Sequence, residues 1–202
     1  AEAEVRLFLL PESEAELLDT WHVAGLRGTG SHEFRVDDLF VPYERSFPRV
    51  ADMPTRPLHA IPSSLLFAGG FAAVALGVAR ASLDFALNLA EDKAQRFERR
   101  PLRDQVWVQD RIGHAETRWQ AAHSFLHTTV AETWASALID WRLSPHELAL
   151  LRMAATDAIR RAEEVVDLAY VVVGTDGIFQ DRDFQRRYQD MKDNTQHLQA
   201  RM

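Results

Sequence analysis

The 202-residue sequence predicts a mainly α protein in which a partial β domain precedes an up-down four-helix bundle. Two observations predict this division. Five of the eight prolines fall within residues 42–62, and downstream only Pro101 and Pro145 interrupt three long proline-free segments. In those segments apolar residues recur every three or four positions, which is the period of an amphipathic helix. We therefore expect residues 1–57 to form part of a middle β domain and residues 58–202 to form the bundle.

Three short strands are expected in the N-terminal part. Residues 5–10 and 21–26 are runs rich in apolar side chains, and residues 33–41 begin with alternating apolar and polar side chains, the period of a half-buried strand. Pro42 ends the third strand because proline cannot donate a ladder hydrogen bond. Three strands leave uncovered edges, so this region is predicted to belong to a larger β domain.

Four helices are expected in the C-terminal part. The first covers residues 65–89, and its small side chains permit close packing of a neighbouring helix or, alternatively, of a second subunit; they are Ala68, Ala72, Ala75 and Ala79. The second lies within residues 102–144. The third begins at Ser144-Pro145-His146-Glu147, which has the pattern of a capping box with proline at the first helical position. Two glycines end it, and a shorter fourth helix follows over residues 184–198.

The composition excludes several classes of protein. With 23 basic and 30 acidic side chains the formal charge is −7, so no basic field attracts nucleic acid. The absence of cysteine excludes a disulfide framework, a thiolate zinc site and a cysteine nucleophile. Residues 60–79 carry no charge, but their glycines and alanines favour a bundle helix over a membrane span. We expect no membrane or nucleic-acid partner, and, because the N-terminal residues do not resemble a signal peptide, a cytoplasmic location.

Motifs of common catalytic sites are not evident. His123 and His127 have the i, i+4 spacing that can hold one edge of a metal site, but no HExxH arrangement accompanies them, so we expect no metal. Gly25-x-x-Gly28-x-Gly30 is not a dinucleotide fingerprint, because a strand rather than a helix is expected after it. No P-loop or GxSxG motif occurs. The residues by themselves therefore identify no reaction.

A family resemblance supplies a candidate reaction. Motifs occur in a fixed order at Trp21–Ser31 with Val36–Pro42, at Leu76–Ala81, at Gly174–Phe179, and at Arg187–Asp190 with Gln196-His197. In this order they resemble the end of the middle β domain, the first bundle helix, the paired-glycine turn and the last helix of the acyl-CoA dehydrogenase superfamily. The final Arg-x-x-Asp…His pattern resembles the hydroxylase-like branch, which contains two-component flavin-dependent monooxygenases.

The resemblance implies a set of site residues. It implies a flavin, FAD or FMN, supplied in reduced form by a separate reductase, and an organic, aromatic substrate. His197 would face the flavin and the substrate as the catalytic residue. Gly174, Gly177 and Arg99 would contact the flavin phosphate, with Arg96 and Arg100 as alternatives to Arg99, and Thr29 and Ser31 would line the substrate pocket. Helix-end turns explain the glycines equally well, and Arg187 could simply pair with Asp190 at i, i+3.

Two alternative functions remain open. A true acyl-CoA dehydrogenase would need a carboxylate base, commonly a Glu shortly after the Arg-Asp motif, and no Glu lies between Asp190 and Met202. A non-catalytic oligomerising bundle is the other alternative, because this sequence shows no counterpart of the family's N-terminal helical domain and begins partway through its β domain. In each case a homo-oligomer, a dimer or tetramer formed through the bundle, is expected.

Overall fold

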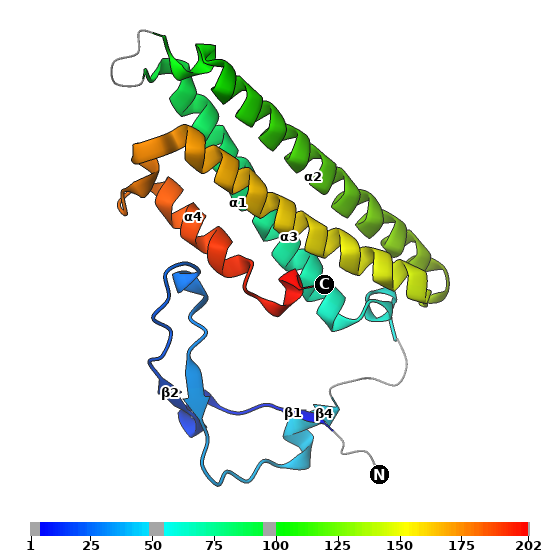
Figure 1. Cartoon of the computed structure of the whole chain (residues 1–202). Helices are drawn as coiled ribbons and strands as arrows, with labels where there is room; N and C mark the ends of the chain where they lie inside the picture. The colour runs from blue at the N-terminus through cyan, green and yellow to red at the C-terminus, as the bar shows by residue number, and fades with distance from the viewer. Residues whose placement is uncertain (1–4, 49–54, 95–99, 202) are drawn as a thin grey trace. The chain divides into compact units, whose positions relative to one another are not determined.

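The computed structural model describes residues 5–48, 55–94 and 100–201 and is mainly helical (Figure 1). Contacts divide the chain into two units. One comprises Ala1–Val23 and Arg27–Thr55, and the other comprises Ala24–Leu26 and Arg56–Met202. The second unit therefore includes three residues from the N-terminal part of the sequence.

The first unit contains two small antiparallel sheets. β1 (Arg6–Phe8) pairs with β4 (Ser46–Pro48), and β2 (Glu16–Leu18) pairs with β3 (Glu33–Arg35). Leu17 lies opposite Phe34 in the second sheet, and each of these side chains is 66% exposed. The pair is thus largely exposed although both side chains are apolar.

The strand predicted over residues 21–26 is wrong, because no strand forms there. The N–H groups of Gly25 and Leu26 bond to aspartate side chains instead of a neighbouring strand, and Leu26 has a φ of 51°, which no extended strand allows. The strand expected over residues 33–41 is confined to β3, and β2 and β4 were not predicted.

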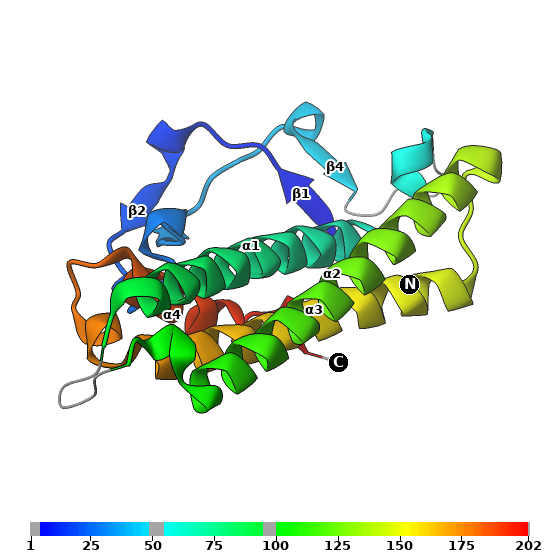
Figure 2. The same ribbon diagram turned by 90° about the horizontal axis from the view of Figure 1, so that it is seen from above.

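The second unit is a bundle of four helices, as predicted. They are α1 (Ser63–Asp92), α2 (Val106–Asp140), α3 (Pro145–Val173) and α4 (Asp183–Asn194). Figures 1 and 2 show α3 running alongside α1 and α2, with the shorter α4 beside α1 and α3. Short 3-10 turns join or follow the helices, among them Gly174–Ile178 and Leu198–Ala200.

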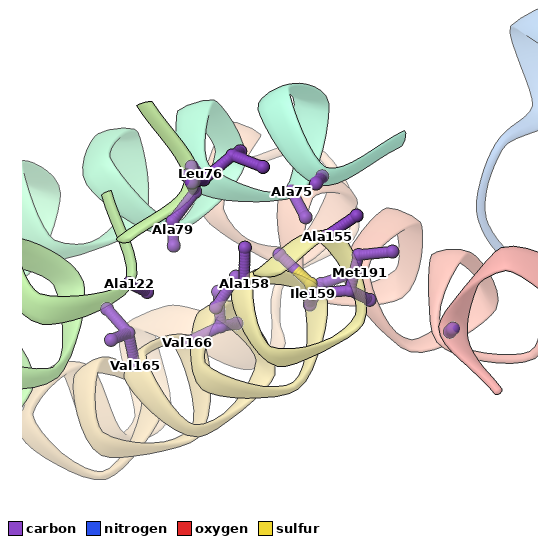
Figure 3. Packing of buried hydrophobic residues seen from close by; sticks show 14 of the residues in the cluster. Ala75, Leu76, Ala79, Ala122, Ala155, Ala158, Ile159, Val165, Val166 and Met191 are labelled. Carbon is purple, nitrogen blue, oxygen red and sulfur yellow. The ribbon is translucent and has the colours of Figure 1, made fainter. Parts of the chain in front are cut away.

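Small side chains form the contact between α1 and α3. Ala75 and Ala79 of α1 and Ala155 and Ala158 of α3 are fully buried in one cluster (Figure 3). Larger side chains fill the layers around them: Leu76, Ile159, Val165, Val166 and Met191. The alanine face of α1 therefore packs inside the bundle, and the alternative that it forms a subunit interface is wrong.

α1 is long and apolar enough, by length and composition, to cross a membrane. A core helix of a bundle has the same composition when other helices cover one of its faces. The helix α3 covers one face of α1, and this face of α1 includes the fully buried Ala72 and Leu83.

Arg80, the arginine of the Leu76–Ala81 motif, connects α1 to α2. Its guanidinium donates to Glu116 of α2 at 2.6 Å and to Asp84 of its own helix at 2.7 Å, and it lies 5.3 Å from the ring centre of Trp119. Trp119 Nε1 in turn donates to the carbonyl oxygen of Leu76 at 2.9 Å. This arginine has a structural role in the bundle.

The capping box at the start of α3 is confirmed. The Ser144 hydroxyl accepts the Glu147 N–H at 3.3 Å, and the Ser144 N–H donates to the Glu147 carboxylate at 2.7 Å. Hydrogen bonds from the side chains of Ser136 and Ser144 to that carboxylate lower the pKa of Glu147 from 4.5 to about 2. Because Ser136 belongs to α2, the carboxylate also joins the end of α2 to the start of α3.

Replacing Ser136 with alanine is expected to raise the pKa of Glu147, since it removes the largest cause of the lowered value. A carboxyl group with a lowered pKa stabilises the folded state above its ordinary pKa of 4.5, and that contribution disappears as the pH falls towards 2. The Glu147 carboxyl carbon, followed by NMR from pH 6 to about pH 2, measures the pKa directly. The same titration midpoint in the parent chain and in Ser136→Ala would contradict the prediction.

Candidate active site around His197

His197 lies in the segment that follows α4. The Thr195 hydroxyl donates to the carbonyl oxygen of Lys192 at 2.7 Å, and the His197 N–H donates to that of Asn194 at 3.2 Å, so the chain turns directly after the helix. His197 then becomes the N-cap of the turn Leu198–Ala200. Its place in the fold is fixed by backbone bonds on both sides.

The imidazole of His197 has a defined orientation. Its ring stacks on Phe71 of α1 with 3.9 Å between ring centres and 13° between planes, and Nδ1 accepts the N–H of Gln199 at 3.2 Å. A neutral imidazole that accepts at Nδ1 carries its proton on Nε2. The residue is exposed, and no group among residues 5–48, 55–94 and 100–201 bonds to Nε2. The ring therefore offers one unoccupied donor edge.

Two carboxylates of α4 bind the backbone of residues 24–26. Gly25 N–H donates to Asp193 at 2.7 Å, and Leu26 N–H donates to Asp190 at 2.6 Å. A Cβ on Gly25 would lie 2.3 Å from the carbonyl carbon and oxygen of Gln189, so only glycine permits this close approach. Both carboxylates therefore hold residues 24–26 against α4.

Sequence reasoning missed this contact, although both partners lie in motifs singled out above. The expected pair between Arg187 and Asp190 is wrong. Arg187 lies 3.5 Å from Asp183, one turn earlier, and Asp190 accepts the Leu26 N–H. A glycine within an otherwise strand-like run was the available signal, but its partner is too distant in sequence for any local pattern to identify.

The paired-glycine turn is explained by the packing of this chain. Gly174 has a φ of 61°, which favours glycine, and ends α3. A Cβ on Gly177 would lie 3.1 Å from the ring of Tyr170. The predicted contact of both glycines with a flavin phosphate stays a prediction.

Acidic and basic side chains around that turn neutralise each other. Lys93, directly after α1, binds Asp176 in the turn, and Arg182 donates to the same carboxylate at 2.9 Å. The hydrogen bond from Lys93 is the largest of the causes that lower the pKa of Asp176. These two cations are therefore already paired. Arg99 and Arg96, predicted to reach the phosphate, lie outside the described residues.

Thr29 and Ser31, predicted to line the substrate pocket, lie in the other unit. Thr29 ends a 3-10 turn, Arg27–Thr29, and accepts a hydrogen bond from the Ser31 hydroxyl at 3.4 Å. Both residues are exposed. Their role towards a substrate stays a prediction.

Two further features lie away from His197. His123 and His127 stack on each other with 4.2 Å between ring centres, and in the part of the chain that the structure describes no group of three metal-binding side chains occurs. An apolar cavity of about 280 Å³ opens between helices of the bundle, lined in part by Leu65, Leu66 and Val130. His197 does not line this cavity.

The sequence of this chain is similar to a known protein family and to several known proteins. Residues 69–202 match the family model described as acyl-CoA dehydrogenase, C-terminal domain. An indole-3-acetate monooxygenase of Pseudomonas putida is 31% identical over 194 residues, which cover 95% of this chain and 50% of that protein. The chain thus spans about half the length of the curated relatives it matches.

Solved structures share the fold. The crystal structure of 3-HSA hydroxylase from Rhodococcus sp. RHA1 aligns with a TM-score of 0.84 and 22% identity, covering 98% of this chain and 53% of that one. XiaF from Streptomyces sp., solved with FADH2 and glycerol, aligns with a TM-score of 0.86 and 21% identity, covering 96% of this chain and 52% of that one.

Proposed function

The chain belongs to the acyl-CoA dehydrogenase family by its C-terminal domain, and on this premise we propose that it acts in the oxygenase component of a two-component flavin-dependent monooxygenase. Relatives named as indole-3-acetate monooxygenase and as the oxygenase subunit HsaA support the oxygenase branch. In this proposal the chain contributes the helical-bundle side of the active site.

The proposal rests on the hydrogen bonds made by the acidic and imidazole groups near the end of α4. A dehydrogenase base is a carboxylate directed at the proton that it removes from the substrate. Asp190 and Asp193 instead accept backbone N–H groups, whereas His197 leaves its Nε2 edge open. This arrangement supports oxygenase chemistry over the removal of an α-proton from an acyl thioester.

The residues fit the ring of a flavin better than its phosphate. A neutral imidazole with its proton on Nε2 donates to an acceptor atom, and the ring system of a flavin has such atoms. At the paired-glycine turn, by contrast, Lys93 and Arg182 are already bound to Asp176. We therefore propose that His197 faces the ring of a reduced FAD or FMN, which supplies the electrons that activate dioxygen.

His197 would act by holding a proton at Nε2. Phe71 keeps the ring in its plane, and the Gln199 N–H occupies Nδ1, so the proton on Nε2 points to whatever ligand adjoins the exposed edge. Donation from Nε2 orients and stabilises an oxygen atom that gains negative charge. An aromatic substrate is proposed because one relative is an indole-3-acetate monooxygenase.

Two kinds of partner are proposed. One is a separate reductase, as the oxygenase-subunit name of a Rhodococcus jostii relative implies for that protein. The other is a second copy of this chain. The outer face of α2 carries large apolar side chains at helical spacing, each about two-fifths to one-half exposed: Val130, Trp134, Leu138 and, at the end of the helix, Trp141. Such a stripe favours a homo-dimer or tetramer through the bundle.

Reduced flavin, dioxygen and an aromatic acid test the proposal. The purified chain is titrated anaerobically with photoreduced FAD and FMN, bound flavin is measured by ultrafiltration, and aerated indole-3-acetate is then added. We expect hydroxylated product. His197→Phe keeps a flat ring against Phe71 but removes the donor, and it should lower product formation about 10²-fold without changing flavin binding. His114→Phe, at an exposed histidine of α2, is the matched control.

Three results would contradict the proposal. Unchanged product formation in His197→Phe would remove the assigned role of the imidazole. Reduction of bound flavin by an acyl-CoA would favour the dehydrogenase alternative. A chain that binds neither reduced flavin would favour the non-catalytic bundle.

A further inference from the structure

The segment that carries His197 is held from α3 by one arginine. Arg152 Nη2 donates to the carbonyl oxygens of Leu198 at 3.2 Å and of Arg201 at 2.9 Å, and Nη1 donates to the side-chain oxygen of Gln199. These three acceptors all lie directly after His197 in the chain. A guanidinium presents its donors in a rigid fork, so it can fix several oxygens of one turn at once.

Gln199 connects this arginine to the imidazole. Its side-chain oxygen accepts from Arg152, while its backbone N–H donates to His197 Nδ1 at 3.2 Å. The residue is only 6% exposed, and the following Ala200 is 1% exposed. The Gln199 N–H that bonds to the imidazole is therefore held in place by the buried Gln199 side chain and by the hydrogen bond of that side chain with Arg152.

The position of that N–H decides which nitrogen of the ring carries the proton. While Nδ1 accepts, the neutral ring has its proton on Nε2. If the turn after His197 loosened, Nδ1 would lose this donor, and both neutral tautomers would become populated. Stacking on Phe71 keeps the plane of the ring but favours neither nitrogen.

We propose that Arg152 is a positioning residue that sets the tautomer of His197 through Gln199. The inference builds on the role proposed above for His197, because only a proton on Nε2 gives the exposed edge a donor. Arg152 does not touch the imidazole; it acts by fixing the turn Leu198–Ala200 on α3. Lysine could not replace it fully, since a single ammonium cannot match the fork that reaches these acceptors.

Nitrogen-15 NMR of the histidine rings tests the proposal on the chain without flavin. His197→Gln identifies the signals of His197. We expect the Nε2–H tautomer in the parent chain and, in Arg152→Met, an about tenfold fall in the ratio of Nε2–H to Nδ1–H forms, which corresponds to the net loss of one hydrogen bond. Arg152→Lys should give an intermediate ratio. Arg160→Met, on the same helix and outside this network, should leave the ratio unchanged.

A second variant covers the case in which Arg152→Met does not fold. Gln199→Met keeps the backbone N–H and leaves Arg152 its two carbonyl partners, so the turn retains part of its support, and a smaller shift of the tautomer ratio is expected. An unchanged ratio in a folded Arg152→Met, or in Gln199→Met if the first variant is unfolded, would overturn the proposal.

The experiment separates this inference from the proposed function. A chain with the expected tautomer shift but without oxygenation would refute the function and retain the positioning role. In an active protein, Arg152→Met should lower kcat while KM stays within about twofold, because the arginine acts on the proton of His197 and not on substrate binding.

Discussion

Replacing Gly25 with alanine is expected to detach residues 24–26 from α4 and to lower the free energy of unfolding of the bundle unit by about 2–4 kcal/mol. The new Cβ would lie 2.3 Å from the carbonyl carbon and oxygen of Gln189 and 2.5 Å from the backbone nitrogen of Asp190. These atoms belong to the helical backbone of α4, which cannot move aside as a flexible side chain could. The two hydrogen bonds to Asp190 and Asp193 would be lost together.

Gly28, three residues later, provides the matched control. A Cβ on Gly28 would meet nothing within 4 Å, so Gly28→Ala should change the stability by less than about 0.5 kcal/mol. Urea unfolding measures both variants, and hydrogen exchange of the Leu26 amide reports whether the segment stays docked. Equal stability and equal Leu26 protection in the two variants would show that the contact with α4 is unimportant.

The second large effect is expected at Phe184 of α4. Phe184→Ala should lower the free energy of unfolding by about 3–5 kcal/mol, the usual cost of deleting a fully buried aromatic ring. The ring is 0% exposed and lies 5.4 Å from Phe85 and 6.2 Å from Tyr170, measured between ring centres. Because α4 leads directly to His197, the same variant should also loosen the segment that holds the imidazole.

Phe67 of α1 is the control for this variant, since its ring is 62% exposed. Phe67→Ala should cost well under about 1 kcal/mol. Thermal and urea unfolding, with helix content followed by circular dichroism, distinguish the two variants. A similar small loss at both positions would mean that α4 contributes little to the core.

The helices were predictable because their signals are local. The proline positions, the 3.6-residue apolar period and the Ser144–Glu147 capping box place α1, α2 and α3 close to their observed bounds. α4 begins as expected but ends at Asn194 instead of residue 198, because the chain turns there and continues as the separate 3-10 turn Leu198–Ala200. The strands were not predictable in the same way. Residues 21–26 have the composition of a strand, but the N–H groups of Gly25 and Leu26 bond to side chains of α4. A contact with a helix that is distant in sequence overrides the local preference for a strand, and periodicity alone cannot predict such a contact.

The candidate site was predictable only in part. A family resemblance singled out His197, but its stacking partner Phe71 and its indirect support Arg152 come from α1 and α3. Both lie far from the last helix in sequence, and neither has a distinctive motif around it. The tautomer of His197 depends on one backbone N–H, which is a property of three-dimensional geometry that residue types do not encode.

The docking of Gly25 and Leu26 also has a consequence for biosynthesis. Their hydrogen-bond partners lie 168 and 164 positions later in the chain. At the usual rate of translation the ribosome needs roughly ten to thirty seconds to add that many residues. During this interval Gly25 and Leu26 lack these hydrogen-bond partners, so the segment can dock only after α4 has been synthesised.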